Sequence, residues 1–208
     1  YTPEGHPEIA IEHGHRYNFF CAPDPISNKD IAPGSILPPG YFFTRIATLS
    51  VVEGKPEPSK IRPAVVPNSL GESQNLEFIY WQMWDALMKE LPIKEDFEEK
   101  IIRTNLDGFT QTYAMSDLMP RQATEGGVID VNLFKGIQDT WDERQALNRV
   151  AVKIPVREAL VKSASAAGTD EQAIVQYFHN PASDKRIVIF GHTHESRVIP
   201  SETHDGKS

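Results

Sequence analysis

The segment Gly191-His192-Thr193-His194 places two imidazoles where they could bind metal ions. It follows an apolar run at 187–190, which predicts a short strand buried on both faces. On an extended backbone, residues two apart point to the same side, so His192 and His194 would be separated by roughly 6.5 Å of chain. That spacing suits two ions about 3.5–4 Å apart, with one imidazole on each. Taken alone, such a pair is also typical of solvated loop histidines.

A second segment near the start of the chain has the same character. In residues 8–13 the side chains of Ile9 and Ile11 alternate along the chain, which predicts a strand, and the strand runs into His13-Gly14. Open α/β sheets bind their ligands where strands leave the sheet. Gly191 has no side chain, so the backbone there can come close to a bound group. Two strands that both run into glycine-adjacent histidines therefore indicate one shared site.

The His-Gly pair after one strand and Gly-His-Thr-His after another resemble the last two motifs of the calcineurin-like metallophosphoesterase superfamily. The resemblance implies that His13 and His192 ligate one metal and His194 the other. It also implies an α/β fold, namely part of a four-layer α/β/β/α sandwich with a large, mainly helical insertion. The implied cofactors are two divalent ions (Mn, Fe, Zn or Ni), and the implied activity is hydrolysis of a phosphomonoester or phosphodiester by a metal-activated hydroxide.

The departure from the family is equally informative. Asp-x-His, Gly-Asp-x-x-Asp and Gly-Asn-His do not occur in the 208 residues. We therefore interpret the chain as a C-terminal portion that shows no catalytic residue, is inactive alone and has the N-terminal portion of the same protein as a partner. Two alternatives stay open: a non-catalytic binding or scaffolding module with a degenerate fold, and a mononuclear structural site of three histidines.

Two residues beside His13 are candidates for contacting substrate. His15 and Arg16 would lie on the loop next to the metals, and a guanidinium or a protonated imidazole makes charge-assisted hydrogen bonds to phosphate. The alternative for Arg16 is an ion pair with a carboxylate. The expected substrate is a phosphorylated small molecule or another phosphoester.

The domain organisation follows from the distance between the two histidine segments. Residues 1–20 and 166–208 are expected to belong to the metallophosphoesterase core, the latter as helix, strand, Gly-His-Thr-His loop and a hairpin at Asp205-Gly206. Residues 21–165 are expected to form an inserted cap, which could select substrate, cover the site or make oligomer contacts. It opens with a proline-rich connector at 21–40.

Apolar periodicity and capping signals predict most of the helices. The strongest pattern is an aromatic and methionine stripe that ends at Pro92, and another helix is expected to stop at Gly168. The expected helices cover residues 41–52, 72–91, 95–103, 140–152, 156–166 and 169–178.

Composition restricts the class of protein. The formal net charge of −8 argues against a broad nucleic-acid or anionic-membrane surface. Cys21 is the only cysteine, so neither an intrachain disulfide nor a cysteine-based zinc site can form. No apolar run approaches the length of about 18 residues that would span a membrane, and no signal-peptide pattern is visible. We therefore expect no membrane association and a cytoplasmic location. His6, His179 and His204 carry no motif.

Overall fold

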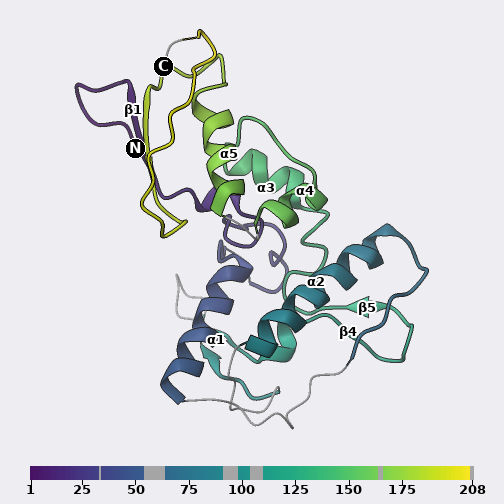
Figure 1. Ribbon diagram of the computed structural model, residues 1–208. Helices are drawn as coiled ribbons and strands as arrows, with labels where there is room; N and C mark the ends of the chain where they lie inside the picture. The colour runs from purple at the N-terminus through teal and green to yellow at the C-terminus, as the bar shows by residue number, and fades with distance from the viewer. Residues whose placement is uncertain (33, 54–63, 91–97, 104–109, 164–165, 207–208) are drawn as a thin grey trace. The chain divides into compact units, whose positions relative to one another are not determined.

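The chain divides into two compact units that are described separately. The computed structural model describes residues 1–32, 34–53, 64–90, 98–103, 110–163 and 166–206. Unit 1 consists of Tyr1–Pro23 and Trp141–Ser208, and unit 2 of Asp24–Thr140. The predicted insertion, 21–165, thus contains unit 2 together with two helices of unit 1. The α/β character is found, since helices and small sheets occur together (Figure 1).

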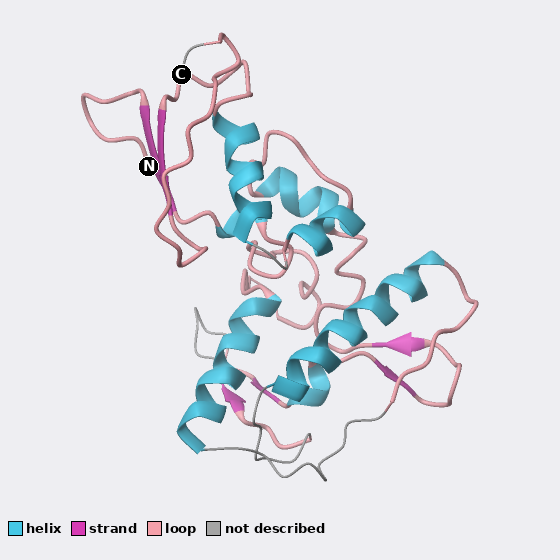
Figure 2. Ribbon diagram, viewed as in Figure 1, coloured by secondary structure: helices cyan, strands magenta, loops and turns pink. Residues whose placement is uncertain are grey.

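The two predicted histidine strands form the sheet of unit 1. β1 (Ile9–Glu12) and β6 (Ile187–Phe190) pair in parallel, with Ile9 opposite Ile187 and Glu12 opposite Phe190. They lie side by side in Figure 2. Both strand predictions are confirmed. The prediction that the second strand is buried on both faces is wrong, because Ile187 and Ile189 are 50% and 54% exposed. Among the described residues, no third strand pairs with β1 or β6.

Three helices complete unit 1: α3 (Trp141–Leu147), α4 (Val156–Lys162) and α5 (Ala166–Tyr177). α3 is shorter than predicted because Arg149 adopts a left-handed φ of 57°, which ends the helix. Leu147 is exposed, whereas Trp141 and Val150 are buried. α5 passes through Gly168 instead of starting after it. A Cβ there would lie 2.5 Å from the Lys162 carbonyl, so this glycine allows a close approach between chain segments.

A buried arginine joins α3 to the segment that follows β1. Arg144 is 0% exposed and its guanidinium lies against the rings of Phe19 and Trp141, 5.5 Å and 5.3 Å from their centroids. Nη2 donates to the carbonyl oxygens of Phe19 and Ala22 at 2.9 Å and 2.8 Å. Buried charge-assisted hydrogen bonds of this kind fix a loop that has no regular structure of its own. The chain between His15 and Ala22 is thereby held on the helices of unit 1.

The described residues of unit 2 form two longer helices and four very short strands. α1 (Pro39–Glu53) and α2 (Glu72–Glu90) confirm two predicted helices, and Pro92 lies outside the described residues. β2 (Ile102–Arg103) pairs with β3 (Thr112–Tyr113), and β4 (Arg121–Gln122) with β5 (Ile129–Asp130), both antiparallel. The predicted helix at 95–103 is therefore wrong at its end, while 95–97 lie outside the described residues. Ile102 is 2% exposed, and its burial opposite Tyr113 outweighs helix propensity.

The rest of the described chain is largely irregular. Two short 3₁₀ turns occur, η1 (His15–Tyr17) in unit 1 and η2 (Met115–Asp117) in unit 2. After β6, the described residues 191–206 contain no strand, so the predicted C-terminal hairpin is not formed. Gly206 does occupy a turn, with φ 72°. None of the helices in the described part of the chain combines the length and hydropathy that a membrane crossing requires.

Asp117 in η2 is the centre of a buried polar cluster in unit 2. The side chain accepts hydrogen bonds from Lys100 Nζ at 2.5 Å, from the Ala114 N–H at 2.8 Å and from Asn132 Nδ2 at 2.8 Å. Burial alone raises the pKa of this carboxyl, but the three donors outweigh burial and hold its pKa below the ordinary value. The ionised form of Asp117 therefore stabilises unit 2.

We expect Asp117→Asn to lower the free energy of unfolding by about 1–3 kcal/mol at pH 7, because an amide cannot accept all three bonds. Since the folded pKa is depressed, this contribution is present above the unfolded pKa of about 3.9 and is lost as pH falls through the folded pKa. Urea unfolding of the wild type and of Asp117→Asn between pH 7 and pH 3 should show the difference between their free energies of unfolding decreasing. Asp130→Asn, which breaks an exposed pair with Lys135, is the control and should cost little. A difference that stays constant with pH would contradict the stabilising role of the ionised Asp117.

Candidate metal centre

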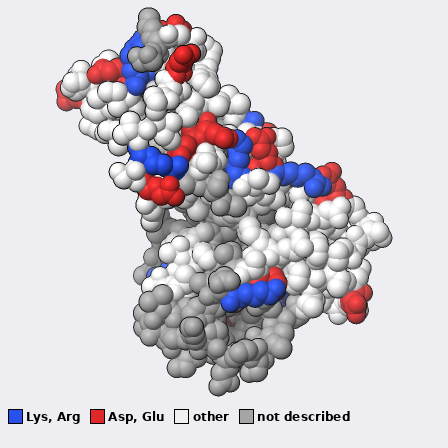
Figure 3. Space-filling model, in the orientation of Figure 1, with Lys and Arg blue, Asp and Glu red and all other residues white. Residues whose placement is uncertain are grey.

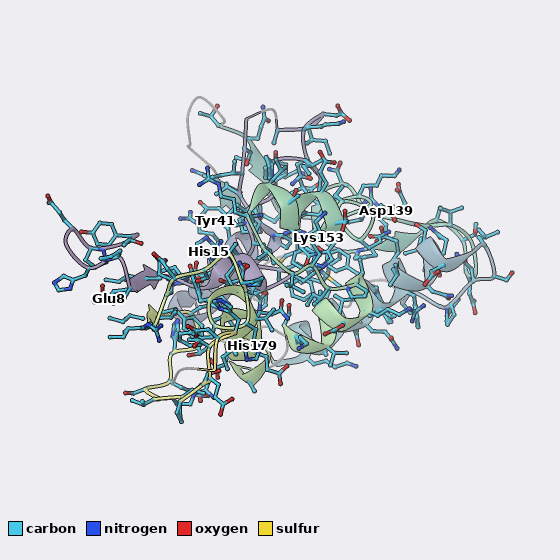
Figure 4. All side chains as sticks on the ribbon, turned by 90° about the horizontal axis from the view of Figure 1, so that it is seen from above. Glu8, His15, Tyr41, Asp139, Lys153 and His179 are labelled. Carbon is cyan, nitrogen blue, oxygen red and sulfur yellow. The ribbon has the colours of Figure 1, made fainter. Side chains whose placement is uncertain are left out.

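The parallel pairing of β1 and β6 brings the two histidine segments together. Glu12 and Phe190 form the last pair of the ladder, and the Gly191 N–H still donates to the Glu12 carbonyl at 3.3 Å. Parallel strands end at the same edge of a sheet. His13 and His192, which follow the strands closely, are therefore carried to one edge of unit 1. In Figure 4, Glu8 lies just before β1 and His15 lies beyond its other end, at the start of η1.

Three imidazoles meet at this edge. The rings of His13 and His192 have centroids 5.4 Å apart in an edge-on arrangement. The rings of His13 and His15 are 5.1 Å apart, with their Nδ1 atoms separated by 3.2 Å. His194 is exposed, yet it is close enough to contribute to the electrostatic environment of His192. The structure thus brings the predicted ligands His13 and His192 into contact, adds His15 to them and leaves His194 at the margin.

The Gly-His-Thr-His loop has a different backbone from the one expected. His192 and His194 both have left-handed φ values, 74° and 58°, and the Thr193 N–H donates to the Gly191 carbonyl at 2.9 Å. The prediction of an extended backbone, with both imidazoles on one side at strand spacing, is therefore wrong. β6 ends at Phe190 and the chain turns. Two non-glycine residues at positive φ in one loop are uncommon, and such backbone strain gathers at binding sites.

Gly14, rather than Gly191, is the glycine that this site requires. Gly14 has φ 90°, and a Cβ on it would lie 2.5 Å from Cδ2 of Phe190. A Cβ on Gly191 would meet only ordinary contacts, the nearest being the His13 carbonyl at 3.7 Å. The expectation that Gly191 lets the backbone come close to a bound group stays a prediction. Gly14 allows the chain to turn between His13 and His15 while Phe190 packs against it.

The half-buried imidazoles are biased toward their neutral forms. Burial lowers the pKa of His192, and His13, His15 and His194 lower it further because positive charges repel. Burial likewise lowers the pKa of His15; His13 and Arg16 act in the same direction and Glu12 opposes them. Neutral imidazole is the form that ligates a metal. The electrostatics of the cluster therefore suit a bound cation.

Arg16 anchors the turn that carries His13 and His15. It pairs with the Glu12 carboxylate at 2.8 Å, and its Nη2 donates to the hydroxyls of Tyr17 and Tyr177 at 2.8 Å and 2.9 Å. Its Nη1 donates to two backbone carbonyls, those of Asn148 and Arg149. Through these bonds the guanidinium links β1 and η1 to the helices of unit 1. Contact with a phosphate, as predicted for Arg16, stays a prediction.

The alternative for Arg16, an ion pair with a carboxylate, is found with Glu12, but sequence reasoning missed its tyrosine partners. Tyr17 donates to Glu12 at 2.5 Å, and burial, followed by the neighbouring Glu12 carboxylate, raises the pKa of Tyr17 well above its usual range. Burial also raises the pKa of Tyr177. Tyr17 packs in a small core with Val150 and Ala173, and Phe190 of β6 lies against it. The opposite charges of Glu12 and Arg16 were the only signal in the sequence, and nothing in the spacing pointed to Tyr177.

The surroundings of the cluster contain a cavity but no complete ligand set. A cavity of about 430 Å³ adjoins the loop at Thr193 and is lined mainly by apolar side chains of α5, β6 and the segment after it. Its two arginines, Arg186 and Arg197, are paired with Asp205 and Asp170. Within the described ranges, no group of three or more His, Cys, Asp or Glu side chains is arranged to hold a metal ion. The donors present fit a transition metal in kind, and a full coordination shell needs further donors.

The face drawn in Figure 3 shows the described Lys and Arg side chains standing among Asp and Glu side chains. Comparison of the chain with protein-family models, with curated proteins and with solved structures found no match in any of the three.

Proposed function

We propose that this chain supplies histidine ligands to the divalent metal centre of a phosphoesterase of the calcineurin-like metallophosphoesterase superfamily. The observation that carries the proposal is the contact between His13 and His192, whose ring centroids are 5.4 Å apart although the residues lie near opposite ends of the chain. Both follow strands of one parallel pair, the place where α/β sheets bind ligands. His194 would serve a second ion.

The exposed sheet of unit 1 supports the finer fold assignment. Parallel sheets are normally covered on both faces, yet Ile187 and Ile189 of β6 are half exposed. A four-layer α/β/β/α sandwich would cover them and would extend the sheet beyond β1 and β6. Unit 2, Asp24–Thr140, lies in the sequence between the two parts of unit 1, as an inserted cap would. The carboxylate and asparagine ligands of the superfamily would then come from outside these 208 residues.

The chemistry proposed for the site divides between metal and protein. Bound divalent ions would supply Lewis-acid charge to the phosphoryl oxygens and lower the pKa of a bound water. His13, His192 and His194 would hold the ions through neutral imidazole nitrogens, which favour borderline transition metals such as Mn, Fe, Zn or Ni. Arg16, through Glu12 and Tyr177, would keep the His13 turn in place. The substrate class is a phosphomonoester or phosphodiester.

Metal removal tests the proposal. We expect the complete gene product to hydrolyse bis(p-nitrophenyl) phosphate, and incubation with a chelator followed by desalting should reduce this activity at least about 100-fold. Adding Mn²⁺ back should restore it. Hydrolysis that survives removal of all detectable metal would contradict the proposal. A metal-loaded protein that hydrolyses neither phosphodiesters nor phosphomonoesters would favour the non-catalytic alternative instead.

A further inference from the structure

His15 has a closer relation to His13 than a substrate-contacting residue requires. Their Nδ1 atoms are 3.2 Å apart, and the two rings are inclined at 58°. Only Gly14, with φ 90°, separates the two residues. The left-handed turn at Gly14 therefore makes the imidazoles converge on each other, where an extended backbone would have held them in parallel.

The separation of the two nitrogens matches joint binding of one ion. Two nitrogens that each lie about 2.0–2.1 Å from a tetrahedral metal are about 3.3–3.4 Å apart. A direct hydrogen bond also fits 3.2 Å, but at the long end of its usual range. In a metal-free protein, a shared proton between the two Nδ1 atoms would hold the same pair together. The distance alone is compatible with both a shared metal ion and a hydrogen bond between the two nitrogens.

The turn is held from several sides. The Tyr17 N–H donates to the Gly14 carbonyl at 3.4 Å, and the Asn18 N–H donates to the His15 carbonyl at 3.1 Å. Arg16, directly after His15, is tied to Glu12 and to the Tyr177 hydroxyl. These bonds fix the backbone on both sides of Gly14, so the two nitrogens are brought together before any ion binds. Preorganisation of this kind is what a metal site needs from its protein.

We propose that His15 is a metal ligand, binding through Nδ1 the same divalent transition-metal ion as Nδ1 of His13. The inference rests on the proposed metal centre but not on hydrolysis. It replaces the expected role of His15 as a phosphate contact. The His13-Gly14-His15 turn then forms a two-nitrogen site by itself. His192, water or further donors would complete the shell, since no group of three ligands is preassembled in the described part of the chain.

Binding of Co²⁺ to the 208-residue chain tests this role without reference to activity. Calorimetry and the visible absorption of Co²⁺ should show one ion bound by the wild type. We expect His15→Ala to weaken binding at least about tenfold and to reduce the visible absorption. His204→Ala, which removes an exposed histidine, should leave both unchanged. Circular dichroism of each variant checks that the chain is folded.

Two further variants separate a ligand from a hydrogen-bonding partner. His15→Gln keeps an amide that can hydrogen-bond His13 but is a poor ligand, so it should behave like His15→Ala. His15→Cys in a Cys21→Ser background should add a near-ultraviolet thiolate-to-cobalt charge-transfer band, which Cys21→Ser alone should lack. Wild-type binding by His15→Gln, no new band in His15→Cys, or no Co²⁺ bound by the wild type would each overturn the inference. Co²⁺ binding through His15 without phosphoesterase activity in the complete gene product would contradict only the proposed function.

Discussion

Replacing His192 with alanine is expected to abolish metal-dependent phosphoester hydrolysis by the complete gene product. His192 adjoins His13 at the edge of the parallel pair, and its half-buried imidazole is biased toward the neutral, ligating form. Loss of an outer-shell partner of a metal ligand already costs about 10–100-fold, so loss of a ligand should lower kcat/KM at least about 100-fold. Turnover of bis(p-nitrophenyl) phosphate and metal content should be measured together.

The experiment has to distinguish the loss of a metal ligand from a change in the backbone conformation at residue 192. His192 has φ 74°, which alanine tolerates poorly, so His192→Asn is the better variant because asparagine adopts left-handed φ more readily. Both variants should lose activity and metal. His179→Ala, outside the cluster, should retain both. If His192→Asn kept wild-type turnover and metal content, the ligand assignment would be wrong.

Gly14→Ala is expected to destabilise unit 1 strongly. The left-handed φ of 90° costs an L-residue about 1–2 kcal/mol, and the new Cβ would lie 2.5 Å from the Phe190 ring, a contact whose relief costs about 1–3 kcal/mol more. We therefore expect the free energy of unfolding to fall by about 2–5 kcal/mol. Urea unfolding followed by tryptophan fluorescence measures this change. Because the turn also sets the distance between His13 and His15, Co²⁺ affinity should fall as well.

Gly5 offers a matched control for this prediction. It has a similar φ, 77°, and no atom lies within 4 Å of the position its Cβ would take. Gly5→Ala should therefore show the backbone cost alone, about 1–2 kcal/mol, and normal Co²⁺ binding. Trimming Phe190 to leucine in the Gly14→Ala protein should recover part of the lost stability. Equal losses in Gly5→Ala and Gly14→Ala would show that Phe190 does not constrain the turn.

Local sequence patterns were sufficient for elements whose signal lies within a few residues. The alternation at 8–13, the apolar run at 187–190 and the periodic stripe of α2 each predicted the right element. The patterns that were used to place the ends of helices were less reliable. Gly168 lies inside α5 close to Lys162, and residues 102–103 form a strand opposite 112–113, because each is fixed by packing against another segment of the chain. Local propensity is too weak to compete with such burial.

The sequence by itself determined which residues could bind metal and that strands would precede them. The tertiary structure decided which of those residues meet. The parallel register of β1 and β6 sets His13 beside His192, the left-handed turn at Gly14 brings His15 to His13, and positive φ angles turn the Gly-His-Thr-His loop away from the extended form. Register and loop conformation depend on pairing and packing between residues far apart in the chain. No local pattern encodes them, and for that reason the sequence left open whether Arg16 contacts a phosphate or pairs with a carboxylate, whereas the structure shows its pair with Glu12 and its bond to Tyr177.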